Sequence, residues 1–252
     1  MTVAYIYFHH PLHELLRARD REPLQRIEFK GQQTIKHLAE SLGIPHTEIG
    51  QIKIAGTHLG FGYIMKNGDT VEVFPASAEN DHLSDMFEHG RLVIPARFIL
   101  DNHLGRLASD MRMLGFDADF SNHFQDTQLA EKAIQTGRIL LTRDRQLLMR
   151  KMIRFGYLVR SLDPDQQLLE ILNRFNITSD INLFQRCTRC NHTLEPVEKQ
   201  EIEHRLEPLT KIYFFDFHIC AGCEQIYWTG SHVTKIKKRL VDLLPQGITD
   251  DI

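Results

Sequence analysis

Short apolar runs alternate with amphipathic stretches through the middle of the chain. Residues 98–100 and 139–142 are apolar runs too short for a helix, which is typical of buried parallel strands. Between them, apolar residues recur at spacings of three and four, ending before Gly115, and this predicts a core-facing helix. The alternation therefore predicts a parallel sheet covered by helices.

Further strands and helices are expected between and after these two apolar runs. Further strands are expected at residues 116–120 and 157–160, and a helix is expected from Asp126 to Gly137. Asp163 followed by Pro164 is typical of an N-cap and first helical position, so a last helix is expected there. Residues 92–180 are therefore predicted to form a small three-layer α/β domain with a parallel sheet.

The first 76 residues have a different order of elements. Strands are expected at residues 3–8, 27–29, 52–54 and 71–74, with a helix at residues 34–42. This α+β order resembles the β-grasp, ubiquitin-like fold, and the ending NGDTVEVFP resembles bacterial sulfur-carrier proteins. Those carriers need a free Gly-Gly end, whereas this chain continues as Ala76-Ser77. An interaction or substrate-positioning module is therefore expected, and the polar residues 77–91 are expected to be a linker.

Composition narrows the range of functions only slightly. The chain has 252 residues and a formal net charge of −3, so overall charge does not indicate a nucleic-acid partner. No apolar stretch reaches the length of a membrane helix, and the start lacks a signal-peptide pattern, so a cytoplasmic protein is expected. Positive charge is concentrated locally, in the basic run at residues 143–154.

All four cysteines form two C-x-x-C pairs in the last third of the chain: Cys187, Cys190, Cys220 and Cys223. This spacing predicts a structural zinc ion held by four thiolates, with no position left for water. Residues 181–252 are therefore predicted to form a zinc ribbon followed by a basic helix at residues 235–240.

Three aspartates follow or open these central elements: Asp101, Asp126 and Asp144. Because ligand sites of parallel sheets lie beyond the carboxyl ends of the strands, these carboxylates are candidates for holding Mg²⁺ or Mn²⁺. Such a cation activates water and neutralises charge on a phosphate. For each aspartate alone a structural role is the more common one, as an N-cap for Asp126 and Asp144 or a strand end for Asp101.

The combined pattern resembles a known family. The strings RFILDNHLGRLASDMRMLGFDADF, DTQLAEKAIQTGRILLTRDRQLL and LVRSLDPDQQLLEIL are similar to the PIN-like ribonuclease domain of the Mut-seven-C RNase family. The resemblance extends through the cysteines and, with the ubiquitin-like start, covers nearly the whole chain. It implies divalent-metal-dependent cleavage of RNA, with Asp101, Asp126 and Asp144 as the catalytic, metal-binding positions. It also implies a phosphate-binding or orienting role for Arg106 and Arg143. Arg143 and Arg145 flank Asp144 on either side, and Arg145 is therefore a further substrate-binding candidate.

The chain departs from the family pattern at two places. Ser109-Asp110 stands where a basic residue and an aromatic are expected, and Asp110 is placed to pair with Arg106 four residues earlier. Gln125 stands where a second acid often lies, which leaves Asp119 as a weak candidate for a fourth carboxylate.

Three functions remain open beside the ribonuclease. They are a catalytically degenerate RNA-binding protein, an adaptor that acts through its ubiquitin-like domain, and an enzyme acting on small phosphate substrates. The partner expected first is RNA, single-stranded or structured, with a protein partner possible at the ubiquitin-like domain.

Overall fold

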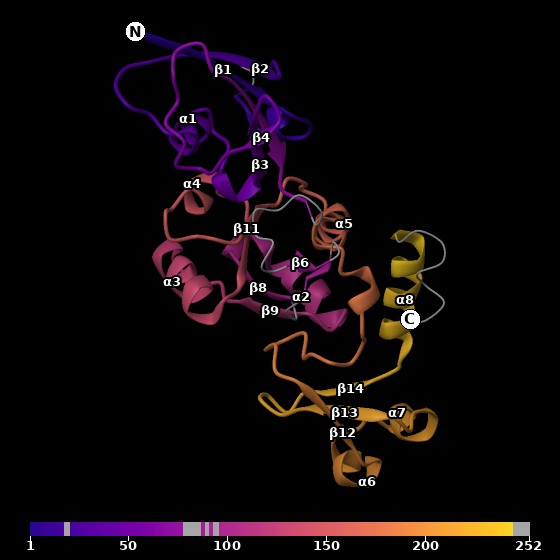
Figure 1. Ribbon diagram of the computed structural model, residues 1–252. Coiled ribbons are helices and arrows are strands. Elements are labelled where there is room, and N and C mark those ends of the chain that lie inside the picture. Colours follow the sequence, from indigo (N-terminus) through magenta and orange to yellow (C-terminus); the bar gives the residue numbers. More distant parts are fainter. Residues whose placement is uncertain (18–20, 78–86, 89–90, 93–95, 244–252) are drawn as a thin grey trace.

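The computed structural model describes residues 1–17, 21–77, 87–88, 91–92 and 96–243. The chain is arranged as three parts in a row, an N-terminal domain, a central domain and a C-terminal domain (Figure 1). Among the described residues, no helix is long and apolar enough to cross a membrane.

The N-terminal domain is built on a five-stranded sheet of order β2-β1-β5-β3-β4. Its strands are β1 (Thr2–Phe8), β2 (Leu24–Phe29), β3 (Ile49–Ile54), β4 (Thr57–His58) and β5 (Thr70–Pro75). Helix α1 (Ile35–Ser41) is capped by Thr34, whose side chain accepts a hydrogen bond from the His37 N–H. Two 3-10 helices, η1 (Leu12–Leu15) and η3 (His46–Glu48), complete the domain. The predicted strands and helix are confirmed; β4, η1 and η3 were not predicted.

The central domain holds a four-stranded, fully parallel sheet of order β11-β10-β8-β9. The strands are β8 (Arg97–Leu100), β9 (Asp117–Phe120), β10 (Ile139–Thr142) and β11 (Gly156–Leu158). The helices are α2 (Gly105–Met113), α3 (Asp126–Thr136), α4 (Arg145–Leu148) and α5 (Pro164–Phe175), with 3-10 helices η5 (Asn102–Leu104) and η6 (Thr178–Asp180).

Helices cover both faces of this sheet, because successive strand residues point to opposite sides. Ile99 and Leu140 belong to the apolar cluster that contains Leu129 of α3. The neighbouring strand residues Phe98, Leu100 and Leu141 belong to a second cluster, with α2 and α5. This arrangement confirms the predicted α/β class with a parallel sheet between two helical layers.

The first of these clusters does not stop at the domain border. It joins Leu148 and Ile153 of the central domain to Leu15 and Ile44 of the N-terminal domain, all nearly fully buried. The two domains therefore share one apolar core rather than meeting only through polar surfaces.

The C-terminal domain is a small antiparallel sheet of order β12-β13-β14 with short helices around it. Its elements are β12 (Leu194–Val197), α6 (Lys199–Ile202), η7 (Glu203–Arg205), α7 (Pro208–Tyr213), β13 (Phe217–Cys220), β14 (Ile226–Trp228) and α8 (Ser231–Leu243). The predicted basic segment at residues 235–240 lies within α8, as expected.

The predicted linker at residues 77–91 is only partly described. Strands β6 (Phe87–Glu88) and β7 (Arg91–Leu92) pair antiparallel at its end, where no strand was expected. These strands are two residues each, too short for a periodic pattern to reveal them. Residues 78–86 and 89–90 lie outside the described part of the chain.

Candidate functional site

Asp101 and Asp144 lie at the carboxyl ends of two adjacent parallel strands. Asp101 directly follows β8, and Asp144 comes two residues after β10. The two strands are paired in register, with Leu100 opposite Leu141. Asp101 is 5% exposed. The structure therefore places both acids at the same edge of the sheet.

The hydroxyl of Thr142 links the two aspartates. It donates a short hydrogen bond to Oδ2 of Asp101, and its oxygen accepts from the Asp144 N–H at 2.9 Å. The Arg143 N–H also donates to Oδ2 of Asp101, at 3.1 Å. Because Thr142 is fully buried, the Asp101 carboxylate is held in one orientation. Sequence reasoning missed Thr142, although it stands inside the LTRD string.

Both aspartates also cap short helices. Asp101 accepts from the His103 N–H at 2.8 Å, and Asp144 accepts from the Gln146 N–H at 2.7 Å. Both residues therefore have a structural role at a helix start. Capping does not exclude metal binding, since an ionised carboxylate offers about four acceptor positions.

Asp126 differs from the other two acids. The N-cap of α3 is Gln125, which forms a capping box with Gln128, so Asp126 is the first helical residue and not the cap. The Asp126 side chain is 57% exposed and lies 3.5 Å from Nη2 of Arg150. A negative charge at this position is favoured by the helix dipole, which accounts for Asp126 without a ligand.

The three acids are spaced differently from a compact group of metal ligands. Among the described residues, two groups have ligand atoms that all lie within 4.8 Å of one another: the four cysteines, and His10 with His13 and Glu14. The three aspartates do not form such a group. Their oxygen donors nevertheless suit a hard cation, and the Asp101–Asp144 pair is the part that the fold itself brings together.

Arg106, a candidate for phosphate contact, and Asp119, a candidate for a fourth carboxylate, each form an ion pair. The Arg106 Nε lies 3.2 Å from Asp110, as the sequence predicted, and Arg239 of α8 lies 3.0 Å from the same carboxylate. Asp119, the weak candidate for a fourth acid, lies 2.6 Å from Nζ of Lys132. These pairs account for Asp110 and Asp119 as structural charges.

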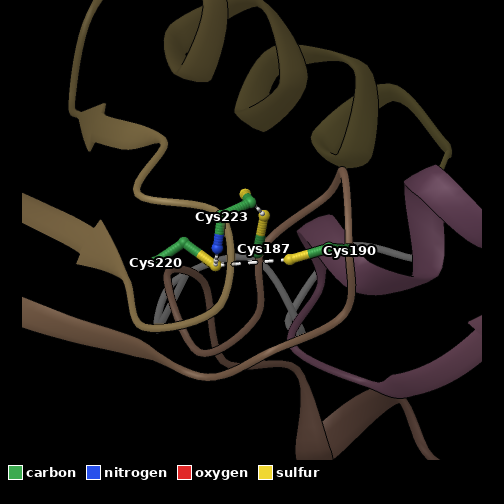
Figure 2. A group of neighbouring side chains, drawn as sticks. All are labelled: Cys187, Cys190, Cys220 and Cys223. Atoms are coloured by element: carbon green, nitrogen blue, oxygen red, sulfur yellow. Dashed lines mark hydrogen bonds between the residues drawn. The ribbon is translucent and has the colours of Figure 1, made fainter.

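The thiols of the four cysteines point toward one another from two loops (Figure 2). Sγ of Cys187 lies 3.6 Å from Sγ of Cys223, and Sγ of Cys190 lies 3.3 Å from Sγ of Cys220. Tetrahedral zinc with Zn–S bonds of about 2.3 Å would need sulfurs about 3.8 Å apart. The cluster can therefore hold a metal ion of this kind, as the spacing predicted.

Polar groups favour the thiolate form at Cys187, whereas burial and bonds to neighbouring thiols raise the pKa of Cys190 to about 12 and also raise the pKa of Cys223. Burial opposes ionisation of Cys187, but hydrogen bonds from the Tyr227 hydroxyl, at 3.1 Å, and from backbone N–H groups lower the pKa of Cys187 to about 6. The N–H groups of Gly222 and Cys223 donate to Sγ of Cys220. Such donors are typical of metal-binding cysteine loops.

The first cysteine loop is attached directly to the central sheet. Arg112 of α2 is 5% exposed and donates to the carbonyls of Ala118, Thr188 and Arg189. Desolvation lowers the pKa of Arg112 below its ordinary value, against the raising effect of nearby carboxylates and thiolates. Asn191 bridges to Asp117, its amide N donating at 2.6 Å. These contacts fix the C-terminal domain against β9.

Comparisons with known proteins agree with this architecture. The family model described as the Mut7-C RNAse domain matches residues 96–240, and the model described as Mut7-C ubiquitin matches residues 1–81. The human protein named "Exonuclease mut-7 homolog" is 36% identical over 107 residues, which are 39% of this chain and 12% of that protein. The chain thus corresponds to a small part of that relative. No solved structure matches significantly.

These matches place a Mut7-C ubiquitin domain before a Mut7-C RNAse domain in this chain. The chain belongs to the Mut7-C RNase family, as the resemblance in the sequence indicated.

Proposed function

We propose that this protein is a divalent-metal-dependent ribonuclease with a PIN-type acidic site. The observation that carries the proposal is the Asp101–Thr142–Asp144 arrangement at the ends of adjacent parallel strands, within the segment that matches the RNase family. The proposed fold is PIN-like for the central domain and β-grasp for the N-terminal domain.

The chain's own residues have distinct roles in this proposal. Asp101 and Asp144 hold the cation, with Thr142 and the Arg143 N–H keeping the Asp101 carboxylate oriented. Asp126 is the proposed third ligand, and it must leave its pair with Arg150 to bind the cation. A bound Mg²⁺ or Mn²⁺ would make water more acidic and neutralise charge on the scissile phosphate. Arg143 and Arg145 bind phosphate oxygens beside the acids, and Arg106, held by Asp110, contributes less.

The four cysteines hold a structural zinc ion in this proposal. All four ligand positions are taken by thiolates, so the zinc leaves no position open for a substrate. Its role is to fold the loops that carry Thr188 and Asn191 against the central sheet.

The test is cleavage of labelled single-stranded and hairpin RNAs with Mn²⁺, Mg²⁺ or EDTA. Asp144→Asn keeps the oxygen that accepts the Gln146 N–H but loses the charge, so cleavage should fall at least about 100-fold while the thermal unfolding temperature stays close to wild type. Asp163→Asn is the matched control, because Asp163 also caps a helix, α5. Cleavage that survives in EDTA, or equally in both variants, would contradict the proposal.

Three observations favour a second candidate, a degenerate RNA-binding protein. Asp126 is paired with Arg150, Gln125 replaces an acid, and the three aspartates do not converge within 4.8 Å. Under this alternative, RNA binds with equal affinity to the wild type and to Asp144→Asn, and no metal yields a product.

A further inference from the structure

A cavity of about 510 Å³ lies where the N-terminal domain meets the ends of β10 and β11. Both domains line it, and four of its eight lining residues are arginines. The lining residues are Glu14, Leu15, Arg21, Arg143, Arg145, Leu158, Val159 and Arg160. Two of the four arginines, Arg21 and Arg160, were not among the residues singled out from the sequence.

The fold holds this cavity in a fixed shape. Arg145 donates a short hydrogen bond to the carbonyl of Leu15, across the domain border. Glu48 of η3 accepts from the Leu158 N–H at 2.7 Å and pairs with Arg160 at 2.7 Å. These contacts, together with the shared apolar core, make the cavity a product of the two domains folding together.

The positive charge in the cavity is only partly balanced. Glu14 is the one acid among the lining residues. Glu48 does not line the cavity, but its buried carboxylate pairs with Arg160. Among the residues that the structure describes, no carboxylate forms an ion pair with Arg143 or Arg145. Burial, and then the nearby guanidinium groups of Arg160 and Arg21, lower the pKa of Arg145 below its ordinary value. Guanidinium groups crowded in this way are stabilised when an anion binds between them.

The cavity adjoins the acidic pair. Arg143 lines the cavity, and its backbone N–H donates to Asp101 at 3.1 Å. The next residue is Asp144, and the one after it, Arg145, lines the cavity again. The cavity and the acidic pair are therefore joined through residues 143–145, so that one nucleic-acid strand could contact both.

We propose that this cavity binds a phosphate group of the RNA, so that the ubiquitin-like domain supplies part of the substrate site through Arg21. The inference rests on the proposed function for its choice of RNA. The cavity falls in the range of roughly 300–1,000 Å³ that small ligands occupy, so it can take a phosphate with its nucleoside. The phosphate is either an internal diester or a terminal monoester of the strand.

Binding in EDTA tests this separately from catalysis. Fluorescence anisotropy would measure the affinity of the full chain for one RNA sequence carrying a 5′-phosphate, a 3′-phosphate or neither. Arg21→Gln removes an exposed arginine, and Glu14→Gln removes the acid among the lining residues, whose carboxylate lies 3.4 Å from Nδ1 of His10. Arg26→Gln and Glu28→Gln are the matched controls, since they remove the same charges from β2 of the same domain.

The two variants should act in opposite directions. Arg21→Gln is expected to weaken binding about tenfold and to reduce the salt dependence by about 0.7 in logarithmic slope, the value for one phosphate contact on a single strand. Glu14→Gln is expected to tighten binding several-fold. An equal loss on all three RNAs identifies an internal phosphate. A loss confined to one phosphorylated RNA identifies that end.

Equal affinities for Arg21→Gln and Arg26→Gln would overturn the inference, as would weaker binding by Glu14→Gln. Unchanged thermal unfolding of Arg21→Gln shows that the domain contact is intact, so a null result cannot be blamed on folding. If RNA is bound as expected but never cleaved with any metal, the proposed ribonuclease fails while the phosphate cavity stands.

Discussion

The carboxylate of Glu48 lies 2.7 Å from the guanidinium of Arg160, a residue 112 positions later in the chain. The Glu48 side chain is 3% exposed, and its other oxygen accepts the Leu158 N–H. The neighbouring His46 bonds to the carbonyl of Ile153 at 2.8 Å. A single 3-10 helix of the N-terminal domain therefore carries much of the polar contact with the central sheet.

The pH dependence of stability should reveal which force dominates at Glu48. Desolvation raises the pKa of Glu48 despite the opposing effect of Arg160, so the folded state holds the proton more tightly than the unfolded state. The protonated form of Glu48 stabilises the folded state at low pH. This stabilisation is lost as the pH rises from the pKa of Glu48 in the unfolded state, about 4.5, through its higher pKa in the folded state. The free energy of unfolding of Glu48→Gln should equal that of the wild type at a pH near the lower of these two pKa values. At a pH above the higher pKa, Glu48→Gln should be the more stable protein.

Chemical denaturation of both proteins across this range checks the prediction. Glu48→Ala is the companion variant, expected to lose about 3–5 kcal/mol because it leaves Arg160 and the Leu158 N–H without their acceptor. If Glu48→Gln is instead the less stable protein at neutral pH, the attraction of Arg160 outweighs the burial of Glu48.

The contact between Glu48 and Arg160 shows the limit of what the sequence could predict. Asp101 and Asp144 were predictable, because parallel strands place their carboxyl ends at one edge and each acid follows an apolar run. The cysteine cluster was predictable from its spacing alone. By contrast, Arg160 and Arg21 enter the same cavity only because two domains pack together, and no local pattern encodes that contact.

The start of α3 shows a second limit. Asp and Gln stand side by side there, and propensity favours Asp as the cap. The structure uses Gln125, because its partner Gln128 completes a reciprocal capping box. A shift of one residue at a helix end is within the range that sequence patterns leave open, yet it decides whether Asp126 is bound to the backbone or exposed.

Thr142→Val should separate positioning from ligation. Valine has nearly the same shape but cannot donate to Asp101 or accept from the Asp144 N–H, so a loss of about 1–3 kcal/mol in stability is expected. On the proposed function, the metal concentration needed for half-maximal cleavage should rise about tenfold or more, since the supporting hydrogen bond is gone. A metal titration of the cleavage rate measures this.

Thr136→Val is the matched control, because its hydroxyl bonds only the Lys132 carbonyl within α3. A purely structural role for Thr142 would lower the unfolding temperature and leave the metal titration unchanged.

Metal content should depend on the cysteines in a graded way. Cys223→Ser is expected to lose the zinc ion, because one of four thiolates is missing. Tyr227→Phe keeps all four thiols but loses the hydroxyl 3.1 Å from Sγ of Cys187, so it should retain one zinc per chain and release it about tenfold more readily. Elemental analysis and chelator competition check both results. Full zinc content in Cys223→Ser would contradict the four-thiolate site.

Gly115→Ala should detach the C-terminal domain from the central sheet. Gly115 ends α2 with φ +94°, and a Cβ built there would lie 2.1 Å from the carbonyl oxygen of Asn182. The backbone of Asn182 cannot move freely, since its N–H donates to the Leu114 carbonyl at 2.9 Å. Gly68 has a similar φ of +84°, but a Cβ there meets nothing within 4 Å.

The two alanine variants therefore share the cost of a left-handed backbone and differ in the contact with Asn182. Gly68→Ala is expected to lose about 1 kcal/mol, the typical penalty for alanine in this conformation. Gly115→Ala should lose at least about 2 kcal/mol more, because a rigid backbone contact is overpacked. Protease digestion should also release the C-terminal domain sooner in Gly115→Ala. Equal losses in the two variants would mean that the segment around Asn182 yields, and that Arg112 and Asn191 hold the domain without it.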